Sequence, residues 1–430
     1  MIYVCDAIMG AGKSSAAITY MNERPRQKFI YVTPFKDETI RIRDACPDLH
    51  FWTPANLEEH EYMKREHFKH LVEVGLNIST THSLFSLCDS EAIELIREKE
   101  YTVIIDEAIT AMDKLSAKAD DIKIAMASEW LQCSDCDDGQ AHEVTVSDIE
   151  YNGDWLRDIR FYASSHRLVA LKNDAGEHKL YCWMVNPELF YAAQDTLVLT
   201  YLFDSSPMSY LFQMNQIEYE PLYVNYEDGQ YFFTKELLYM PEYTARLDKM
   251  IHILQNDRMN AIGNANRALS INWSKEAVKR PSNGHANELR KNLENYFRNI
   301  HREDAKNPKD RMWSCHGTLE TTLRGKGYTN RFLVFNSRAT NEWKDAFVLA
   351  YCANVFMPVW EKRYYEQEGV TVNDNLYSLS VMIQWIWRSA IRDGKEIWIY
   401  VPSSRMRGLL EQWIADVTAL GQRHNQPLTA

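Results

Sequence analysis

Short apolar runs alternate with amphipathic stretches along the first third of the chain. The runs are rich in β-branched and aromatic residues and end in polar residues, as is typical of a parallel sheet covered by helices on both faces. The predicted strands are residues 1–5, 29–33, 77–80 and 102–105. The predicted helices are residues 13–22 and 38–46, and one that begins within residues 81–88. Sites on such sheets lie at the carboxyl ends of the strands, where the polar motifs of this sequence fall.

Residues 112–190 interrupt this alternation of predicted strands and helices. Within them, residues 167–185 have the pattern of two strands around a turn at 173–176. The strand pattern resumes at residues 196–200, followed by polar residues. We therefore predict a first α/β domain, residues 1–245, that carries an insertion with a β-hairpin at about 112–190.

A second α/β pattern follows and predicts a second domain, residues 246–430. Its predicted strands are residues 268–273, 331–335 and 396–401. Its predicted helices are residues 288–301, 341–356, 376–392 and 406–420. At 430 residues the chain is long enough for two domains, each with its own core. The predicted fold class is α/β, with a parallel sheet in each domain.

The composition mainly serves to exclude classes of protein. The chain is 45% hydrophobic and 25% charged, which is typical of a globular protein. It has no run of about eighteen uncharged apolar residues, and residues 1–6 lack the basic region of a signal peptide. We therefore expect a cytoplasmic protein with no membrane contact.

The eight cysteines lie mostly in apolar segments, which indicates reduced core residues. Cys133 and Cys136 form the one close pair, with His142 nearby. A structural zinc site needs about four ligands, and no second pair follows. We expect these two cysteines to lie in a polar loop without binding a metal; a zinc site is the alternative.

Charge is distributed unevenly. The formal net charge is −12, but residues 271–331 contain thirteen Lys/Arg and seven Asp/Glu. Aromatic residues lie between these charges at Trp273, Tyr296, Phe297 and Trp313. Cations that pair with phosphates and rings that stack on bases would bind unpaired nucleic acid; a helix core with a solvated face is the alternative. The candidate cations are Lys275, Arg290, Lys291, Arg298, Arg311, Arg324 and Lys326.

Residues 7–15 match the phosphate-binding loop that joins a strand to a helix. The pattern is Gly, four residues, then Gly-Lys-Ser/Thr, and here Ala7 replaces the first Gly. Gly10 and Gly12 let backbone N–H groups wrap phosphates at the helix N-terminus. Lys13 is expected to neutralise β- and γ-phosphate charge and Ser14 to hold Mg²⁺. The backbone of Ala7, Gly10, Ala11, Gly12, Lys13, Ser14 and Ser15 forms the predicted nucleotide cradle.

An acidic pair, Asp106 and Glu107, follows the strand at 102–105. Asp106 is expected in the Mg²⁺ shell, and Glu107 is expected to orient and deprotonate a water. A solvated strand end would have the same sequence. In the same sheet as a phosphate-binding loop, however, the pair favours hydrolysis of ATP with Mg²⁺.

The run Asp-Glu-Ala-Ile at 106–109 resembles motif II of superfamily 2 helicases of the DEAD-like type. Thr33-Pro34 looks like motif Ia and residues 79–82 (Ser-Thr-Thr-His) like motif Ib, loops that touch the nucleic-acid backbone in that family. Thr200 occupies the place of motif III, although the family's Ser-Ala-Thr is absent. Residues 335–341 follow a predicted strand as motif V would. The resemblance implies two RecA-like domains.

Residues 384–392 (Gln-Trp-Ile-Trp-Arg-Ser-Ala-Ile-Arg) resemble motif VI, Gln-x-x-Gly-Arg-x-x-Arg. Gln384 and Arg388 match in spacing, Trp387 replaces the Gly, and Arg392 comes one residue late. On one helix, Gln384, Arg388 and Arg392 would share a face. The resemblance then implies that Arg388 is an arginine finger that reaches ATP when the domains close.

Among these helicases the chain looks most like phage-encoded ones, and its phosphate-binding loop is also similar to that of herpesvirus origin-binding helicases. The resemblance implies a helicase or translocase in phage DNA replication or recombination, with DNA, single-stranded or forked, as partner. Other replication proteins are possible partners, and the host cytoplasm is the expected location. With only six residues before the loop, no upstream adenine-reading glutamine motif is expected, so nucleotide selectivity stays open.

Two other functions fit the same motifs. One is a motor that moves along duplex DNA without separating its strands. The other is an ATP-switched module that binds nucleic acid or an origin and hydrolyses ATP only incidentally.

Overall fold

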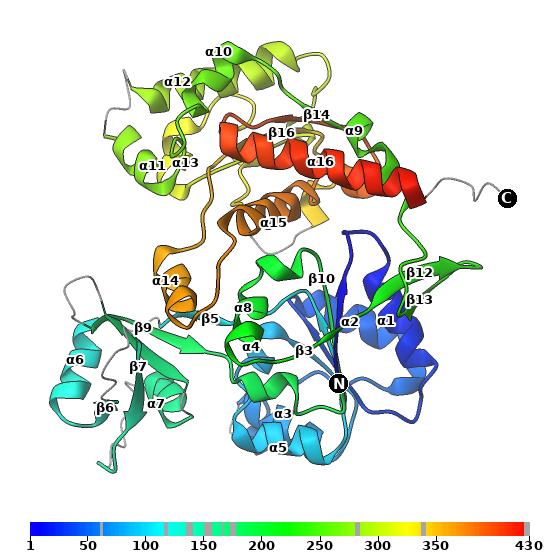
Figure 1. The fold of residues 1–430 in the computed structure, drawn as a ribbon, viewed down its shortest axis with the longest axis vertical. Coiled ribbons are helices and arrows are strands. Elements are labelled where there is room, and N and C mark those ends of the chain that lie inside the picture. Colours follow the sequence, from blue (N-terminus) through cyan, green and yellow to red (C-terminus); the bar gives the residue numbers. More distant parts are fainter. Residues whose placement is uncertain are drawn as a thin grey trace. The chain divides into compact units, whose positions relative to one another are not determined.

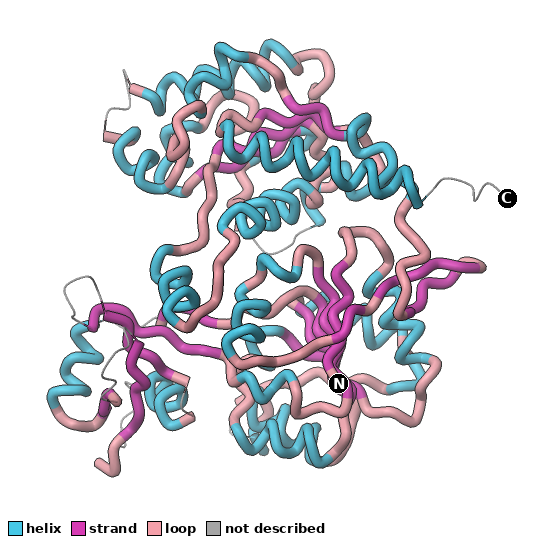
Figure 2. Tube along the Cα trace, viewed as in Figure 1, coloured by secondary structure: helices cyan, strands magenta, loops and turns pink. Residues whose placement is uncertain are grey.

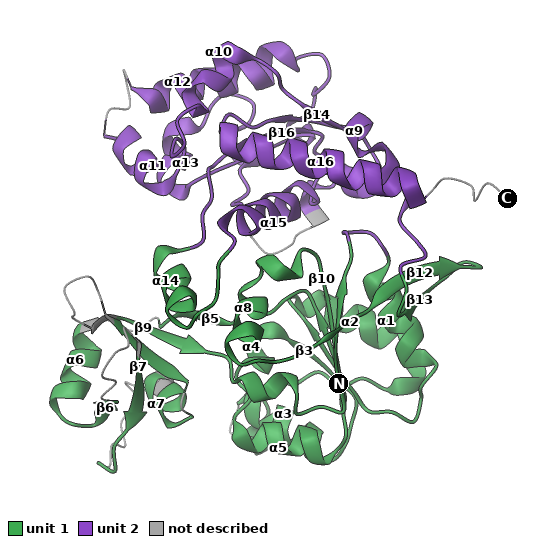
Figure 3. Ribbon diagram, in the orientation of Figure 1, with its two compact units in different colours: residues 1–7, 12–236, 358–372 green, residues 8–11, 237–357, 373–430 purple. Residues whose placement is uncertain are grey.

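The fold is taken from a computed structural model of the chain. It describes residues 1–60, 63–115, 119–134, 141–149, 157–165, 167–172, 178–279, 284–336 and 341–424. Two compact units divide the chain (Figure 3). Unit 1 comprises Met1–Ala7, Gly12–Glu236 and Pro358–Val372, and unit 2 comprises Ile8–Ala11, Leu237–Met357 and Asn373–Ala430.

Unit 1 is built on a six-stranded parallel sheet with the order β11-β1-β10-β4-β2-β3 (Figure 1). Its strands are β1 (Ile2–Asp6), β2 (Phe29–Thr33), β3 (Ile78–Thr81), β4 (Thr102–Asp106), β10 (Asp195–Thr200) and β11 (Glu220–Pro221). The predicted strands of the first third are therefore confirmed, to within one residue at each end.

Alternate residues of these strands face opposite sides and join two separate cores. Val4, Ile30 and Val103 belong to one core, whereas Tyr31 and Ile104 belong to the other. Because both faces are buried, the strands read as continuous apolar runs. The first core is covered by α3 (Lys64–Glu73), α4 (His82–Phe85), α5 (Ser90–Glu98) and α8 (Pro207–Met214). The second is covered by α1 (Lys13–Asn22) and α2 (Lys36–Ala45).

The predicted insertion is a five-stranded antiparallel sheet with the order β5-β9-β8-β7-β6, accompanied by two helices (Figure 2). Its elements are β5 (Met112–Lys114), α6 (Ala119–Ala127), β6 (Leu131–Cys133), β7 (Ala141–Val146), α7 (Arg157–Ser164), β8 (Leu168–Lys172) and β9 (His178–Met184). The β8–β9 pairing confirms the predicted hairpin, while its turn lies outside the described residues. Buried Arg167 donates to the Met184 carbonyl within the insertion and to the Ser86 and Cys88 carbonyls in the loop between α4 and α5, which ties the insertion to that loop.

A second hairpin, which the sequence reasoning missed, follows β11. It consists of β12 (Tyr223–Glu227) and β13 (Gln230–Thr234), and β13 packs along α1. Asp228 (φ 49°) and Gly229 (φ 83°) form its turn in left-handed backbone. Asp-Gly between alternating strands is a strong signal for such a turn, and it was available in the sequence.

Unit 2 contains a four-stranded parallel sheet with the order β14-β17-β16-β15. Its strands are β14 (Ile251–Ile253), β15 (Arg311–Cys315), β16 (Val348–Cys352) and β17 (Ile397–Tyr400). Its helices are α9 (Leu247–Met250), α10 (Asp257–Asn260), α11 (Ile271–Ala277), α12 (His285–Asn295), α13 (Gly317–Leu323), α15 (Asp374–Ile386) and α16 (Ser404–His424). A π-helical turn, Tyr296–Ile300, continues α12.

Three predicted elements of this unit are wrong. Residues 268–273 are not a strand, because the Ser270 side chain accepts from the Trp273 N–H and caps α11. Residues 331–335 form no ladder strand beyond a single bridge between Trp313 and Phe332. Residues 341–356 were expected to be a helix, but β16 runs through them with all five residues buried. A short, wholly buried apolar run has no periodicity that separates a strand from a helix.

The molecule is thus α/β, with two parallel RecA-like or Rossmann-like sheets and an antiparallel insertion sheet. Among the residues that the structure describes, no helix has the length and apolar character needed to cross a bilayer.

One helix from the second half of the sequence, α14 (Val359–Gln367), packs in unit 1. The ring of Tyr365 lies 5.2 Å from that of Tyr210 on α8. Glu361 of α14 is buried, and burial, with a smaller contribution from the charge of Asp113, raises its pKa to about 8. The folded protein therefore holds Glu361 as the neutral acid near neutral pH.

Substituting Glu361 tests this ionisation. In the unfolded chain the pKa of a glutamate is about 4.3, so ionisation of Glu361 makes the folded state less stable as the pH rises from about 4.3 to 8. Each unit of pKa shift corresponds to roughly 1.4 kcal/mol. We expect Glu361→Gln, which mimics the neutral acid, to raise the Tm at pH 8 and to leave it unchanged at pH 4. Exposed Glu368→Gln is the control, and an equal response of the two variants in thermal melts would contradict the prediction.

Candidate nucleotide-binding site

The candidate phosphate-binding loop, residues 7–15, contains two glycines in left-handed backbone. Gly10 and Gly12 have φ values of 81° and 88°, in the left-handed region that favours glycine. Ala7, which replaces the first Gly of the pattern, is absent from the residues with positive φ, so glycine is not required there. The Ala7 N–H instead donates to the Thr200 carbonyl at 3.0 Å, which ties the loop to β10.

Helix α1 begins at Lys13 with no side-chain cap and no acidic residue in its first turn. The first N–H groups of a helix lack intrahelical partners, and its N-terminus carries partial positive charge. Ser14 is half-buried and Ser15 is exposed in this turn. The end of α1 therefore suits an anion such as a phosphate group.

Lys13 lies back across the loop, where its ammonium group donates to the Ala7 carbonyl. Burial lowers the pKa of Lys13, whereas the nearby carboxylates of Asp106, Asp6 and Glu107 act to raise it. A γ- or β-phosphate in the loop would add negative charge beside Lys13 and favour its charged form.

Asp106 connects this loop to the neighbouring strands. Its Oδ2 atom accepts hydrogen bonds from Ser14 Oγ at 3.0 Å and from Tyr31 Oη at 2.8 Å. Burial raises the pKa of Asp106, and the hydrogen bonds from Tyr31 and Ser14 and the charge of Lys13 limit that rise. Ser14 and Asp106 supply adjacent oxygen ligands of the kind Mg²⁺ prefers, so the predicted metal pair fits the ion.

The peptide between Asp106 and Glu107 is held from both sides. The Asp106 carbonyl lies 2.8 Å from His82 Nε2, which must carry the proton because a carbonyl only accepts. The Glu107 N–H donates to the Leu199 carbonyl at 2.8 Å. Glu107 has φ 68°, a conformation that side chains other than glycine seldom adopt, and it is exposed to solvent. Its position beside the loop is therefore imposed by the surrounding strands.

Asp6 fixes the loop after β10. Its two carboxylate oxygens accept from the Leu202 N–H at 2.7 Å and the Phe203 N–H at 3.0 Å. Thr200, predicted as motif III, ends β10 and is buried. Asp6 thus links the strand that precedes the phosphate-binding loop to the strand that ends at Thr200.

Asp6 and Tyr31 were not predicted as site residues, and His82 was predicted only as part of the motif Ib-like loop that would touch nucleic acid. Asp6 follows the rule that polar residues at strand ends mark a site, so a signal existed. Tyr31 lies inside a fully buried apolar strand, where a tyrosine looks like core. Burial and the charge of Asp106 raise the pKa of Tyr31 further, which keeps its phenol protonated and donating.

The two motifs predicted to touch nucleic acid are largely enclosed. Thr33, Ser79 and Thr80 are buried at the ends of β2 and β3, whereas Pro34 and Thr81 are partly exposed. For the motif V prediction, residues 337–340 lie outside the described residues.

The shared helix face predicted for Gln384, Arg388 and Arg392 is wrong. Helix α15 ends at Ile386, and the Ser389 hydroxyl donates to the Ile386 carbonyl at 2.6 Å, next to the break. Arg388 follows the helix and donates to the Gln384 carbonyl at 3.4 Å, while Arg392 lies on a separate 3₁₀ turn. The chain turns there because Ala390 N–H bonds to the Ala346 carbonyl.

The aromatic residues of the basic segment belong mainly to the core of unit 2. Tyr296, Phe297 and Trp313 have no exposed surface, so they cannot stack on bases in this structure, and Trp273 is half-buried. Arg311 donates to the Gly327 and Ala305 carbonyls. Arg290 and Arg324 pair with glutamates on their own helices or next to them. The candidate cations that are exposed without such a role are Lys275, Lys291, Arg298 and Lys326.

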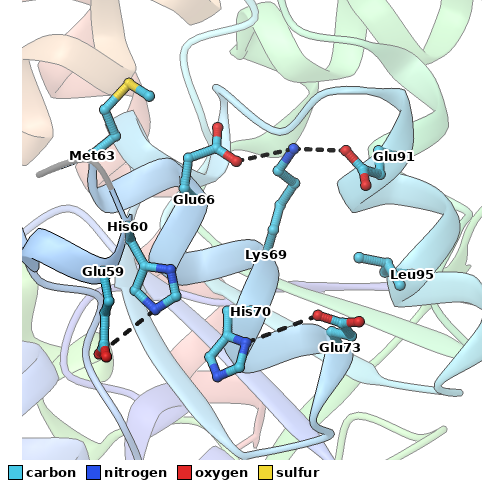
Figure 4. A pocket seen from close by; sticks show the side chains of 9 residues that line it. All are labelled: Glu59, His60, Met63, Glu66, Lys69, His70, Glu73, Glu91 and Leu95. Atoms are coloured by element: carbon cyan, nitrogen blue, oxygen red, sulfur yellow. Dashed lines mark hydrogen bonds and ion pairs between the residues drawn. The ribbon is translucent and has the colours of Figure 1, made fainter.

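A hollow in unit 1 lies among α3, α5 and residues 59–60 (Figure 4). Lys69 bonds to Glu66 and Glu91 at 3.2 and 2.7 Å, and the His70 ring lies 3.9 Å from Glu73. The lining has four glutamates against one lysine and two histidines, so the hollow is acidic overall. In the described part of the chain, no three His, Cys, Asp or Glu side chains form a metal site. Cys136 of the possible zinc pair lies outside that part.

Removing the Tyr31 hydroxyl tests its role in holding Asp106. Tyr31→Phe keeps the buried ring but deletes a charge-assisted hydrogen bond, a change of roughly 1.5–3 kcal/mol. We expect the Kd for Mg²⁺ in the presence of ATP to rise by about tenfold or more, with an unchanged circular dichroism spectrum. Titration calorimetry measures the Kd. Tyr101→Phe, which removes a buried hydroxyl bonded to the Leu76 carbonyl, is the control, and equal losses in both variants would refute the assignment.

Acidification tests the pKa of Asp106. Only the ionised carboxylate binds Mg²⁺, and burial raises the pKa of Asp106 above the usual value of about 3.9. Mg²⁺-dependent ATP binding should therefore weaken as the pH falls, starting at a higher pH than for an ordinary aspartate. Because Tyr31 lowers this pKa, Tyr31→Phe should move the midpoint of the loss to higher pH. A midpoint that does not move would mean that another group controls the transition.

Comparisons with known proteins give the family of the chain. A family model described as the YonV C-terminal Rossmann-like domain matches residues 245–414. Solved structures show distant similarity: XPD_Helicase has a TM-score of 0.45 at 11% identity over 97% of this chain and 95% of that chain. Xpd4 of S. tokodaii has a TM-score of 0.48 at 12% identity over 96% and 94%.

A much closer match comes from sequence. The SPbeta prophage-derived uncharacterized protein YonV of Bacillus subtilis (strain 168) is 35% identical over 426 residues, which cover 96% of this chain and 98% of that protein. At this identity and coverage, the chain belongs to the YonV family.

Proposed function

We propose that the protein is an ATPase that uses hydrolysis to act on nucleic acid as a helicase or translocase. The observation that supports this best is the hydrogen-bonded cluster of Ser14, Asp106 and Tyr31 beside the phosphate-binding loop. It gathers residues from three separate elements, β2, β4 and α1, at the carboxyl end of one sheet. A coincidental glycine turn would not require that arrangement.

Each residue of the site has a role in this proposal. The N–H groups of the loop and of the α1 N-terminus bind the phosphates, and Lys13 neutralises their charge. Ser14 and Asp106 hold Mg²⁺, which would offset charge on the phosphate oxygens. Tyr31 positions Asp106 and is not itself in contact with substrate.

Glu107 is the proposed general base. Its carboxylate is exposed, and its backbone is fixed by Leu199 and, through Asp106, by His82. A base held in place can take a proton from water without first being ordered, which lowers the entropic part of the barrier.

The action on nucleic acid rests on the order of the helicase-like motifs. Gln384 and Arg388 keep the spacing of motif VI, and Arg388 is the proposed arginine finger. Arg392 is the proposed second arginine of that motif. DNA is the proposed partner, through the exposed cations Lys275, Lys291, Arg298 and Lys326. Because the related YonV is prophage-derived, we place this activity in phage DNA replication or recombination, together with other replication proteins.

The first test measures ATP hydrolysis by wild type, Lys13→Ala and Glu107→Gln, each with and without single-stranded DNA, duplex DNA and RNA. We expect turnover that one polymer stimulates, loss of ATP binding in Lys13→Ala, and a 10²- to 10⁴-fold lower kcat in Glu107→Gln with ATP binding retained. Lys123→Ala, on the exposed face of α6, is the charge-matched control.

The outcomes separate the possible functions. If no polymer changes the rate of ATP hydrolysis and the protein binds one nucleic-acid sequence tightly in the presence of ATP, the protein is an ATP-switched binding module and not a motor. Stimulation by duplex DNA without unwinding of a forked substrate would indicate a duplex motor. Absence of ATP binding by wild type would refute the proposal.

A further inference from the structure

The sheet order gives the phosphate-binding loop two different sides. On one side of β1 lie β10 and then β4, which carries Asp106 and Glu107 at its end. On the other side lies β11, followed along the chain by the β12–β13 hairpin (Figure 1). A nucleotide whose terminal phosphate faces Asp106 and Glu107 must direct its nucleoside away from them. The hairpin lies on that opposite side.

The hairpin is fixed against the start of α1. Val224 of β12 is buried in the core that α1 covers, and the Phe233 ring lies 6.2 Å from the Tyr20 ring of α1. Tyr231 lies directly over the last glycine of the loop, because a Cβ added at Gly12 would be 2.2 Å from Tyr231 Cδ1. Two features therefore require glycine at position 12: its left-handed backbone and the close approach of the Tyr231 ring.

A second ring extends this aromatic surface towards solvent. Tyr226 is the cross-strand partner of Tyr231, and their ring centroids are 4.6 Å apart. Tyr231 is half-buried, whereas Tyr226 is 45% exposed. The pair thus forms a continuous aromatic surface from the phosphate-binding loop to the outside of the unit.

The charges of the hairpin indicate what this surface binds. Its tip carries exposed Glu227 and Asp228, and Lys235 is paired with Glu220 at 2.9 Å. This acidic tip disfavours the phosphates of a nucleic-acid strand, but a neutral base next to a triphosphate held elsewhere meets no such repulsion. Aromatic side chains stack on the faces of bases and tolerate different bases, because every base has a π-face.

We propose that Tyr226 and Tyr231 form the base-stacking subsite for the nucleotide whose phosphates bind the loop. This subsite rests on the proposed function, since it needs a nucleoside triphosphate at Lys13. Recognition by ring faces alone also implies weak selectivity between purines, so ATP and GTP should bind with similar affinity.

Comparing ATP with inorganic tripolyphosphate isolates the contribution of the nucleoside. Titration calorimetry with Mg²⁺ gives the Kd of each ligand for wild type, Tyr226→Ala, Tyr226→Phe and Tyr191→Ala. We expect Tyr226→Ala to weaken ATP binding by roughly 5- to 150-fold, the range for one base–aromatic stack. Tripolyphosphate binding should not change. Tyr226→Phe keeps the ring and should bind ATP as wild type does, as should Tyr191→Ala, whose side chain is 51% exposed in the same unit.

Each other result overturns the subsite in a distinguishable way. If wild type binds ATP and Tyr226→Ala binds it equally well, the subsite is refuted while the proposed ATPase stands. An equal loss for ATP and tripolyphosphate would mean that the hairpin supports the loop and not the base. Unchanged ATP binding with weaker oligonucleotide binding would assign the rings to nucleic acid. If wild type binds neither ligand, both proposals fall.

Discussion

One carboxylate oxygen, Oδ2 of Asp106, accepts hydrogen bonds from Ser14 on α1 and from Tyr31 on β2. A partly enclosed carboxylate is costly unless its hydrogen-bonding capacity is met. Meeting it requires α1, β2 and β4 to hold their relative positions. The start of α1 is therefore held against β2 and β4 by the same few atoms that would receive a metal ion.

The sequence predicted the first unit well because local signals there agree with the global fold. Residues 13–22 and 29–33 were predicted with the bounds the structure has, since a glycine loop and a buried apolar run mark them clearly. Lys13, Ser14, Asp106 and Glu107 could be proposed as site residues because strand, loop and helix occur in a fixed order. Tyr31 could not, because its role depends on its neighbour across the sheet and not on its own sequence context.

The second unit was harder for physical reasons. The run at 348–352 is buried on all sides, so it lacks the alternation that identifies a strand. Residues 384–392 look like one helix by spacing, yet Ala390 is drawn to the backbone of Ala346 and the helix ends early. The aromatic residues of 271–331 resembled a stacking surface only because sequence does not show which face of a helix is inward. Tertiary contacts decided each of these cases.

The chain enters and leaves the antiparallel insertion of unit 1 through adjacent strands, since Met112 pairs with Met184 in β5 and β9. A segment whose two ends lie side by side can be gained or lost as a cassette without moving the strands that flank it. Removal of the cassette would leave the carbonyls of Ser86 and Cys88 without the hydrogen bonds that Arg167 now donates, so they would need another donor or water.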